Sequence, residues 1–147
     1  MTKAEQNSWK TAIVRKNYSL PFQYLLRHHF IDLLNDRVLD FGCGRGFDAI
    51  YGMIDKYDPH YFPEMPDGKF DVVMCNYVVN VLPKSCESKV IKQIFDKLKK
   101  GGTAYVTVRR NLKKAGYTSS GTYQRLVYLD WTTIYEDNDF CIYAKTK

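Results

Sequence analysis

Residues 38–46 hold the first group of side chains whose types and spacing could do chemistry. A short apolar run carries Asp40 near its end, and Gly42, Gly44 and Gly46 follow it in a GxGxG pattern. Glycine accepts a positive φ, and its missing Cβ lets the backbone lie close to a bound nucleotide-like ligand. The same pattern also suits a strand-to-helix turn that binds nothing, so the glycines alone leave both interpretations open.

Neighbouring residues narrow the kind of ligand. A dinucleotide-binding turn has the pattern GxGxxG, and a phosphate-cradling loop ends in GK followed by Ser or Thr. Neither pattern is present. Asp58 instead ends the next predicted strand, where a carboxylate can accept hydrogen bonds from both hydroxyls of a ribose. The pair formed by Asp58 and Pro59 is also typical of a simple turn, so this second role stays open.

The hydrophobic pattern predicts the elements that must position these residues. Residues 37–44 and 54–59 have the composition of strands, and residues 47–53 allow only a short helix between them, which makes a cramped βαβ unit. Before this unit, residues 19–34 predict a helix with Ser19 as its N-cap and Pro21 in its first turn. The expected apolar face of this helix consists of Phe22, Leu25, Leu26, His29, Phe30 and Leu33.

The second half of the chain predicts a buried strand over 70–82, a helix over 85–101 and a strand over 103–109. Ser85 is the expected N-cap of the helix and Gly101 its stop. Its apolar stripe consists of Val90, Ile91, Ile94, Phe95 and Leu98. A basic loop over 110–122 precedes predicted strands at 125–129 and 131–145, and residues 136–139 form the turn of a closing antiparallel hairpin. We expect residues 1–147 to form one domain.

The net charge of +6 favours a polyanionic partner, because Lys and Arg side chains release counterions when they neutralise phosphates. A charged surface explains the same residues equally well. The basic residues gather in two groups, namely Lys97, Lys99 and Lys100, then Arg109, Arg110, Lys113 and Lys114. The second group is the candidate contact for nucleic acid.

No apolar run approaches the roughly 20 residues that cross a bilayer, and the polar N-terminus lacks the features of a secretory signal. We therefore expect a cytoplasmic protein without a membrane contact. The four cysteines form no CxxC pair, and no histidine offers metal-ligand spacing beside them. The sequence thus predicts neither a metal site nor a disulfide framework.

Four segments, taken in order, resemble class I S-adenosylmethionine-dependent methyltransferases. Residues 38–46 resemble motif I, residues 57–59 the acidic motif II, and residues 70–82 motif IV, while residues 98–109 resemble the Gly-Gly turn and strand that follow. The resemblance implies S-adenosylmethionine as cofactor. It also implies an α/β fold with a compact, abbreviated Rossmann-like methyltransferase sheet, mostly parallel, with a C-terminal antiparallel hairpin.

The same resemblance implies roles for individual residues. Cofactor contacts are implied for Asp40, Gly42, Cys43, Gly44, Asp58, Pro59 and Asn76. Asp40 would help to orient the methionine end, and Asp58 would hold the ribose. Asn76 would offer a backbone carbonyl to the methionine ammonium, and Asn76 and Tyr77 would face the methyl group as candidate catalytic residues.

The N-terminal stretch is the next candidate for cofactor contacts. Lys10 or Arg15 would pair with the cofactor carboxylate if this stretch folds over the site, although either can equally be a surface charge. The loop after Asp58 is too short for the usual additional βα unit that contacts adenine. Tyr61 and Phe62 are candidates to replace it by stacking, or else they belong to the local core.

A narrower resemblance links the chain to methyltransferases associated with DNA phosphorothioation. The segments KTAIVR, DFGCGRG, YDPHYFP and NYVVNVL occur here in that family's order, beginning at Lys10. The resemblance implies a role in DNA modification or phage defence. The Asp-Pro-Pro-Tyr, Asn-Pro-Pro-Tyr and Pro-Cys motifs of other nucleic-acid methyltransferases are absent.

Three hypotheses about function follow. The first is an enzyme that methylates nucleic acid, and the second is a methyltransferase for small molecules or proteins. The third is a cofactor-binding subunit without activity of its own. Under each hypothesis, we expect the side-chain amide of Asn80 to form hydrogen bonds with groups nearby in the chain, rather than to act in catalysis.

Overall fold

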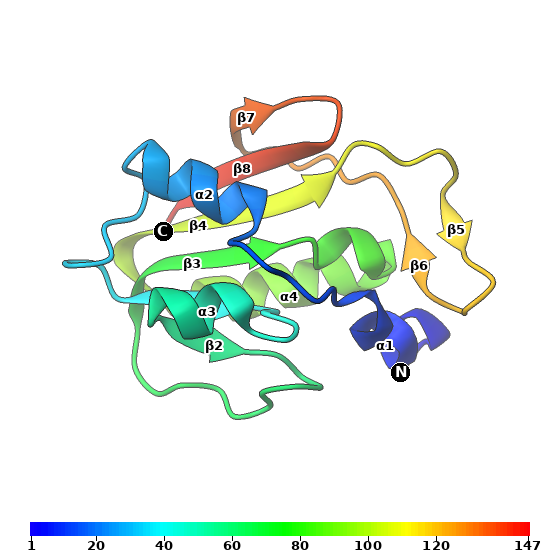
Figure 1. Cartoon of the computed structure of the whole chain (residues 1–147), viewed down its shortest axis with the longest axis horizontal. Helices are drawn as coiled ribbons and strands as arrows, with labels where there is room; N and C mark the ends of the chain where they lie inside the picture. Colours follow the sequence, from blue (N-terminus) through cyan, green and yellow to red (C-terminus); the bar gives the residue numbers. More distant parts are fainter.

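A computed structural model describes all residues of the chain, Met1–Lys147. Its centre is a six-stranded sheet in the order β2-β1-β3-β4-β8-β7 (Figure 1). The strands are β1 (Val38–Phe41), β2 (Asp55–Tyr57), β3 (Phe70–Asn76), β4 (Leu98–Arg109), β7 (Thr132–Glu136) and β8 (Phe140–Thr146). Strands β1 to β4 pair in parallel, whereas β7 and β8 form an antiparallel hairpin at one edge. The predicted fold class is confirmed.

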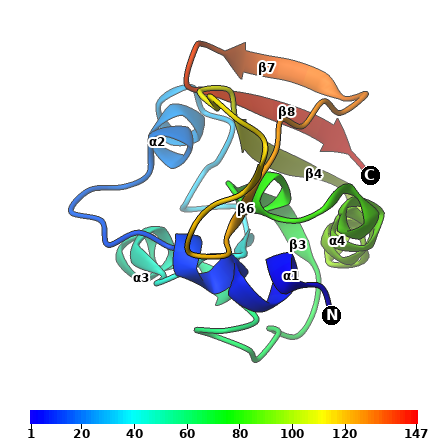
Figure 2. The ribbon, with the colours of Figure 1, turned by 90° about the vertical axis from the view of Figure 1, so that its right-hand side faces the viewer.

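Both faces of the sheet are covered, which explains why its inner strands are apolar almost throughout. On one face, Val90 and Ile94 of helix α4 (Lys84–Asp96) pack on β3 and β4. On the other face, Phe22 and Leu25 of helix α2 (Leu20–Arg27) pack on β1, β3 and β8. Figure 2 shows α2 and the short α3 (Phe47–Gly52) on the side of the sheet opposite α4.

Helix α2 begins as predicted but ends early. The Ser19 hydroxyl accepts a hydrogen bond from the backbone N–H of Phe22, and Pro21 lies in the first turn. The helix stops at Arg27 because the chain reverses at His29, whose φ is 61°. His29, Phe30 and Leu33 therefore lie beyond the helix and do not extend its apolar face, which corrects the prediction.

Helix α4 also differs from the prediction at both ends. Pro83 is its N-cap, so Ser85 lies inside the first turn, and the helix ends at Asp96. The chain leaves the helix to pair with β3, where Lys97 accepts a hydrogen bond from the N–H of Phe70. Strand β4 then begins at Leu98, and Gly101 lies within this strand instead of stopping the helix.

Strand β3 is shorter than predicted, because the chain turns sharply after Asn76. Tyr77 has a φ of 61°, and a short 3₁₀ turn, η2 (Val79–Val81), follows it. The expected strand at 125–129 is absent. A small hairpin of β5 (Gly116–Tyr117) and β6 (Tyr123–Gln124) forms just before it. We call residues 110–131, which include this hairpin, the strap.

The N-terminus forms two elements that the pattern did not predict, α1 (Lys3–Asn7) and η1 (Ser8–Thr11). They lie beside the strap at the carboxyl ends of the parallel strands (Figures 1 and 2). The Asn7 side chain donates to the carbonyl of Gly121 at 3.4 Å, and the Lys3 ammonium lies 5.4 Å from the centre of the Tyr117 ring. These contacts join the two segments across more than 100 residues of sequence.

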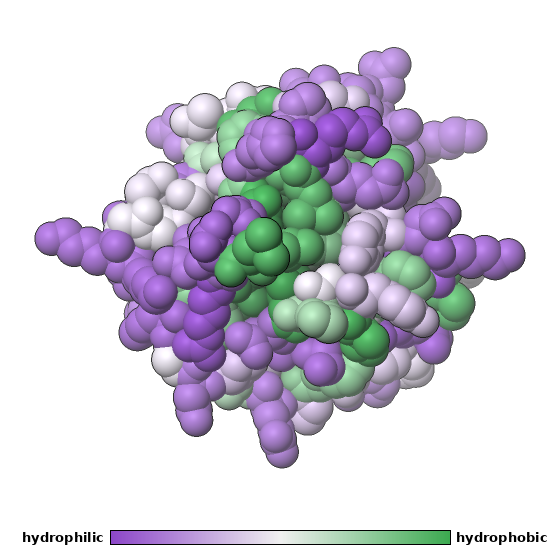
Figure 3. All heavy atoms as spheres, turned by 60° about the vertical axis from the view of Figure 1, so that its left-hand side comes forward, coloured by the Kyte–Doolittle hydropathy of each residue, from purple (hydrophilic) through white to green (hydrophobic).

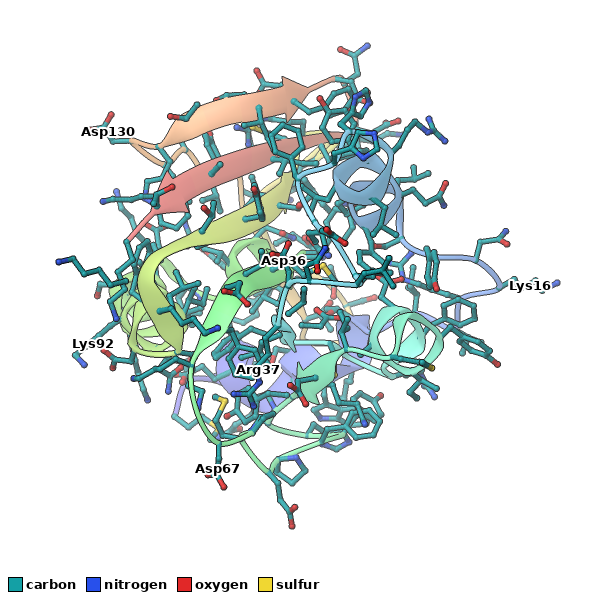
Figure 4. The ribbon with its side chains drawn as sticks, turned by 90° about the vertical axis from the view of Figure 1, so that its left-hand side faces the viewer. Lys16, Asp36, Arg37, Asp67, Lys92 and Asp130 are labelled. Carbon is teal, nitrogen blue, oxygen red and sulfur yellow. The ribbon has the colours of Figure 1, made fainter.

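The opposite end of the sheet carries hydrophilic side chains around an apolar area (Figure 3). Arg37 binds the β2–β3 loop there by donating to the carbonyls of Asp67 and Lys69, and it pairs with Asp55 at 3.5 Å (Figure 4). No helix combines the length and the apolar character needed to cross a membrane.

Candidate active site

A cavity of about 940 Å³ lies at the carboxyl ends of the parallel strands. This edge is where open α/β sheets bind their ligands. The glycine-rich turn after β1, Asp58 after β2 and Asn76 at the end of β3 line it. The N-terminal segment and part of the strap lie on the remaining sides, so the cavity is roofed by the two segments that meet at Asn7 and Gly121.

The glycine-rich turn has the backbone conformation that its sequence predicts. Gly42, Gly44 and Gly46 have φ values of 76°, 57° and 83°. A Cβ on Gly42 would lie 2.3 Å from Cγ2 of Val78, so the turn packs directly against the segment that follows β3. A glycine is thus needed here for close packing within the protein as well as for its φ.

Asp58 has the turn-forming role that the sequence left open, and its place in the cavity lining leaves the ribose contact a prediction. One carboxylate oxygen accepts from the N–H of Gly44 at 2.9 Å, and the other accepts from the N–H groups of His60 and Tyr61 at 2.9 and 3.1 Å. The residue also lines the cavity together with Pro59. A carboxylate has about four lone-pair sites, so the three bonds to the turn leave about one site, on Oδ2, for a ribose hydroxyl.

Asp40 is placed differently from the prediction. It is 4% exposed and lies outside the cavity lining, whereas its neighbours Gly42, Cys43 and Gly44 line the cavity. Burial, reinforced by the charge of Asp48, raises the pKa of Asp40 well above its usual range. Asp40 is thus buried behind the lining residues Phe41, Gly42 and Cys43, and its predicted contact with the cofactor stays a prediction.

Replacing Asp40 by asparagine is expected to raise the free energy of unfolding at pH 8. The folded-state pKa is raised, so the contribution of Asp40 to stability is present in full below its unfolded pKa of about 3.9 and is lost as pH rises through the folded pKa. Denaturant unfolding at pH 5 and pH 8 measures this dependence. The exposed Asp130→Asn is the control, and equal pH slopes for the wild type and Asp40→Asn would contradict the expectation.

Asn76 and Tyr77 both line the cavity, at the end of the central parallel strand. The Asn76 Oδ1 atom is buried and has no hydrogen-bond partner within the chain. Buried polar atoms without partners are rare, and a ligand N–H would satisfy this one. Tyr77 is held in the left-handed region by its turn, a conformation that clusters at functional sites. Burial raises the pKa of Tyr77 to about 12, so its phenol is neutral at physiological pH.

Asn80 is a buried polar residue of the cavity lining, which its sequence context did not predict. It is 0% exposed and also lines the cavity. Its Nδ2 donates to Oε1 of Gln124 on the strap at 3.1 Å, but its Oδ1 has no partner. The expectation of a locally satisfied amide is thus wrong, because the nitrogen bonds to a residue 44 positions away and the oxygen has no partner.

Of the two N-terminal cations, Arg15 is the one that reaches the cavity. Lys10 lies outside the lining, and its ammonium lies 5.8 Å from the centre of the Trp9 ring. Arg15 lines the cavity, makes no ion pair within the chain, and its charge acts on Asp40 and Tyr77. The N-terminal stretch therefore lies at the cavity, and of the two cations named from the sequence only Arg15 lines it, whereas the contact with the cofactor carboxylate stays a prediction.

The aromatic residues predicted for adenine lie outside the cavity lining. The Tyr61 hydroxyl donates to the carbonyl of Trp9 at 3.4 Å, and Phe62 packs against Gly46. Trp9 and His60 line the cavity instead, with their rings stacked 4.3 Å apart at an interplanar angle of 9°. Sequence reasoning missed both, although Trp9 directly precedes the KTAIVR segment and His60 follows the Asp-Pro pair.

The basic residues at the end of β4 and on the strap divide into three kinds. Arg109 lines the cavity. The Arg110 side chain is only 10% exposed, because it pairs with Glu136 at 2.8 Å and donates to the carbonyl of Val127 and the hydroxyl of Tyr143. Lys113 and Lys114 are exposed. Arg110 thus stabilises the strap, and the candidate nucleic-acid contacts are reduced to the other three residues.

Comparisons with known proteins agree on one family. A family model described as a methyltransferase domain matches residues 14–141. No curated protein sequence matches the chain.

Among solved structures, the chain resembles the 1,6-didemethyltoxoflavin-N1-methyltransferase of Burkholderia thailandensis, crystallised with 1,6-didemethyltoxoflavin and S-adenosylhomocysteine. The TM-score is 0.63 at 13% identity, over 97% of this chain and 82% of that one. The PH0226 protein of Pyrococcus horikoshii OT3 gives a TM-score of 0.59 at 11% identity, over 90% and 92% of the two chains. At these identities the likeness shows the fold.

Proposed function

The chain belongs to the methyltransferase-domain family, and from this premise we propose that it binds S-adenosylmethionine in the cavity and transfers the methyl group to an acceptor beside Asn76 and Tyr77. One observation carries the proposal. The glycine-rich turn, the Asp58 carboxylate and the unpartnered Oδ1 of Asn76 come from three neighbouring parallel strands and line one cavity.

The residues present fit the three parts of this cofactor. The Asp58 carboxylate suits the ribose hydroxyls, and the Asn76 side chain or carbonyl suits the methionine ammonium. Arg15 suits the methionine carboxylate, because a guanidinium binds a carboxylate through two parallel hydrogen bonds. The flat rings of Trp9 and His60 suit adenine. The N-terminal segment thereby supplies the flank that an additional βα unit would cover.

The protein's part in such a reaction is mainly positioning. Bound S-adenosylmethionine supplies an electrophilic methyl group, whose bond to sulfur breaks as the bond to the acceptor forms. Asn76 and Tyr77 face the acceptor side of the cavity, and the neutral phenol of Tyr77 can donate a hydrogen bond there. The N-terminal segment and the strap cover part of the cavity, which limits the access of water and favours an aligned displacement.

Arg15→Gln is expected to weaken S-adenosylmethionine binding about tenfold or more, because it removes a charge-assisted hydrogen bond to the carboxylate. Lys10→Gln, five residues earlier in the same segment, is expected to leave the affinity unchanged, since Lys10 lies outside the cavity lining. Isothermal titration calorimetry of both variants measures the difference. A loss of affinity in Lys10→Gln alone would show that the assignment of the two cations is reversed.

As acceptor we propose nucleic acid, in the setting of DNA modification or phage defence. The net charge of +6, the exposed Lys113 and Lys114 on the strap and the similarity of the KTAIVR and NYVVNVL segments to methyltransferases associated with DNA phosphorothioation support this. The roof over the cavity requires a target base outside the duplex, either extruded or in a single strand. We place the activity in the cytoplasm, where four free cysteines remain reduced.

A planar small molecule is the second candidate acceptor. The roofed cavity favours it, because about 940 Å³ lies at the upper end of the range of roughly 300–1,000 Å³ for small-molecule sites. The Burkholderia enzyme with the similar fold acts on a compound of this kind, as its bound 1,6-didemethyltoxoflavin indicates.

Transfer of labelled methyl from S-adenosylmethionine separates the two candidates. DNA, RNA, protein and small-molecule fractions are offered separately, each at low and high salt. Label in a nucleic-acid fraction that falls steeply with salt supports nucleic acid. Label in the small-molecule fraction that is indifferent to salt supports the second candidate, and label in protein alone contradicts both.

A further inference from the structure

Arg109 lies on the side of the cavity away from the cofactor-binding residues. The strand order β2-β1-β3-β4-β8 places Asp58 and the glycine-rich turn after β2 and β1. Arg109 ends β4 and pairs with Phe140, the first residue of β8. Asn76 and Tyr77, at the end of β3, lie between these two halves. A methyl donor on the β1 side therefore leaves the β4 side for the acceptor.

The guanidinium of Arg109 is poorly neutralised within the chain. Its Nε donates to Oδ1 of Asn111 at 2.9 Å, and its two terminal nitrogens have no partner. Asp139 lines the same end of the cavity but forms no ion pair with it. Asp137 is engaged elsewhere, because its carboxylate accepts from Tyr135, Asp139 and Phe140. This differs from Arg110, the next residue, whose guanidinium has three partners.

The surroundings of Arg109 indicate the shape of its ligand. Tyr77 and Phe140 both line the cavity beside it, and their rings meet edge to face at 6.4 Å and 80°. Aromatic walls suit a planar ring, whereas the free terminal nitrogens of a guanidinium suit a carboxylate or phosphate. Arg15 and Arg45 are the other guanidinium groups in the lining without an ion pair. The methionine carboxylate of the cofactor accounts for Arg15, whereas the exposed Arg45 lies over the Tyr61 ring at 5.5 Å, on the glycine-rich turn and away from β4.

We propose that Arg109 binds an anionic group of the methyl acceptor, so that the acceptor is a planar compound carrying a phosphate or carboxylate next to its methylated ring. This rests on the proposed function, since it assigns the acceptor half of the same cavity. It makes Arg109 a specificity-determining residue. Arg109 recognises the substituent, and Asn76 and Tyr77 face the atom that receives the methyl group.

The test uses the full chain saturated with S-adenosylhomocysteine, and inorganic phosphate and acetate as separate probes. The side-chain Nε–Hε signal of Arg109, assigned by its loss in Arg109→Gln, is followed by NMR during each titration. Arg27, which is exposed at the end of α2, is the internal control. We expect a saturable shift at Arg109, with an apparent affinity about tenfold or more above that of Arg27 for at least one probe.

The two probes distinguish the sources of the anion. Tighter binding of phosphate assigns a nucleotide-like acceptor, and tighter binding of acetate assigns a carboxylate. Linear shifts of equal size at Arg109 and Arg27 with both probes would overturn the proposal. Calorimetry with S-adenosylhomocysteine is done first, so that a failure of cofactor binding, which would contradict the proposed function, is recognised separately. In that case the Arg109 signal can still be titrated in the free protein.

Discussion

Asp58→Ala is expected to weaken S-adenosylmethionine binding about 100-fold. The substitution removes the acceptor for the ribose hydroxyls, and hydrogen bonds to a charged group contribute about 1.5–3 kcal/mol each. It also removes the hydrogen bonds that hold the N–H groups of Gly44, His60 and Tyr61, so the turn loses its preorganised shape. Calorimetric titration with S-adenosylmethionine measures the affinity.

Asp67→Ala is the matched control for Asp58→Ala. Asp67 lies in the same β2–β3 loop, its side chain is exposed, and it points away at the opposite end of the sheet (Figure 4). Only its backbone carbonyl is used, by Arg37. We expect wild-type affinity from this variant. Equal affinities for the wild type and Asp58→Ala would remove Asp58 from the cofactor site and leave it only the role of a turn former.

Gly42→Ala is expected to lower the free energy of unfolding by about 2–5 kcal/mol and to abolish methyl transfer. Two effects combine. A residue with a Cβ at a φ of 76° costs about 1–2 kcal/mol, and the clash with Val78 adds about 1–3 kcal/mol. Relief of the clash would move the segment that carries Tyr77. Denaturant unfolding and a transfer assay measure the two losses.

Two variants separate the contributions at Gly42. Gly101 has a φ of 84°, and a Cβ added to it would meet nothing within 4 Å, so Gly101→Ala reports the cost of the backbone conformation alone. Adding Val78→Ala to Gly42→Ala makes room for the new methyl group and should recover part of the lost stability. If Gly42→Ala is no worse than Gly101→Ala, the close packing of the turn against Val78 contributes nothing.

The glycine-rich turn and Asp58 were predictable because their roles are local. The positive φ values at Gly42, Gly44 and Gly46 follow from the residue type, and the strand before them follows from an uninterrupted apolar run. Asp58 directly follows β2, a strand that pairs in parallel with β1, so it must lie beside the glycine turn. The mostly parallel sheet and its closing hairpin were equally predictable from the sequence.

The element ends were less predictable, because tertiary contacts decide them. The apolar stripe of helix α4 continues through Leu98 by sequence, but Leu98 lies in β4. Pairing with β3 outweighs helix propensity at this point. Similarly, residues 77–82 have strand-forming composition, yet the chain turns there and packs on Gly42.

The roof of the cavity was hidden from the sequence for a related reason. Trp9 stacks on His60, and Asn80 bonds to Gln124, across long separations in the chain. No local pattern marks such pairs. Lys10 lies in a short 3₁₀ turn and Arg15 in the irregular segment after it, so no periodic pattern indicates which of the two reaches the cavity. The burial of Asp40 is likewise a product of tertiary packing.

A crystal structure of the chain with S-adenosylhomocysteine would test the central claim most directly. We predict that the ligand lies along Gly42 and Gly44 with its ribose hydroxyls within hydrogen-bond distance of Asp58. Its carboxylate should contact Arg15, and its adenine should lie against Trp9 or His60, leaving the side of Arg109 open. A ligand bound elsewhere, or one whose ribose does not contact Asp58, would contradict the account.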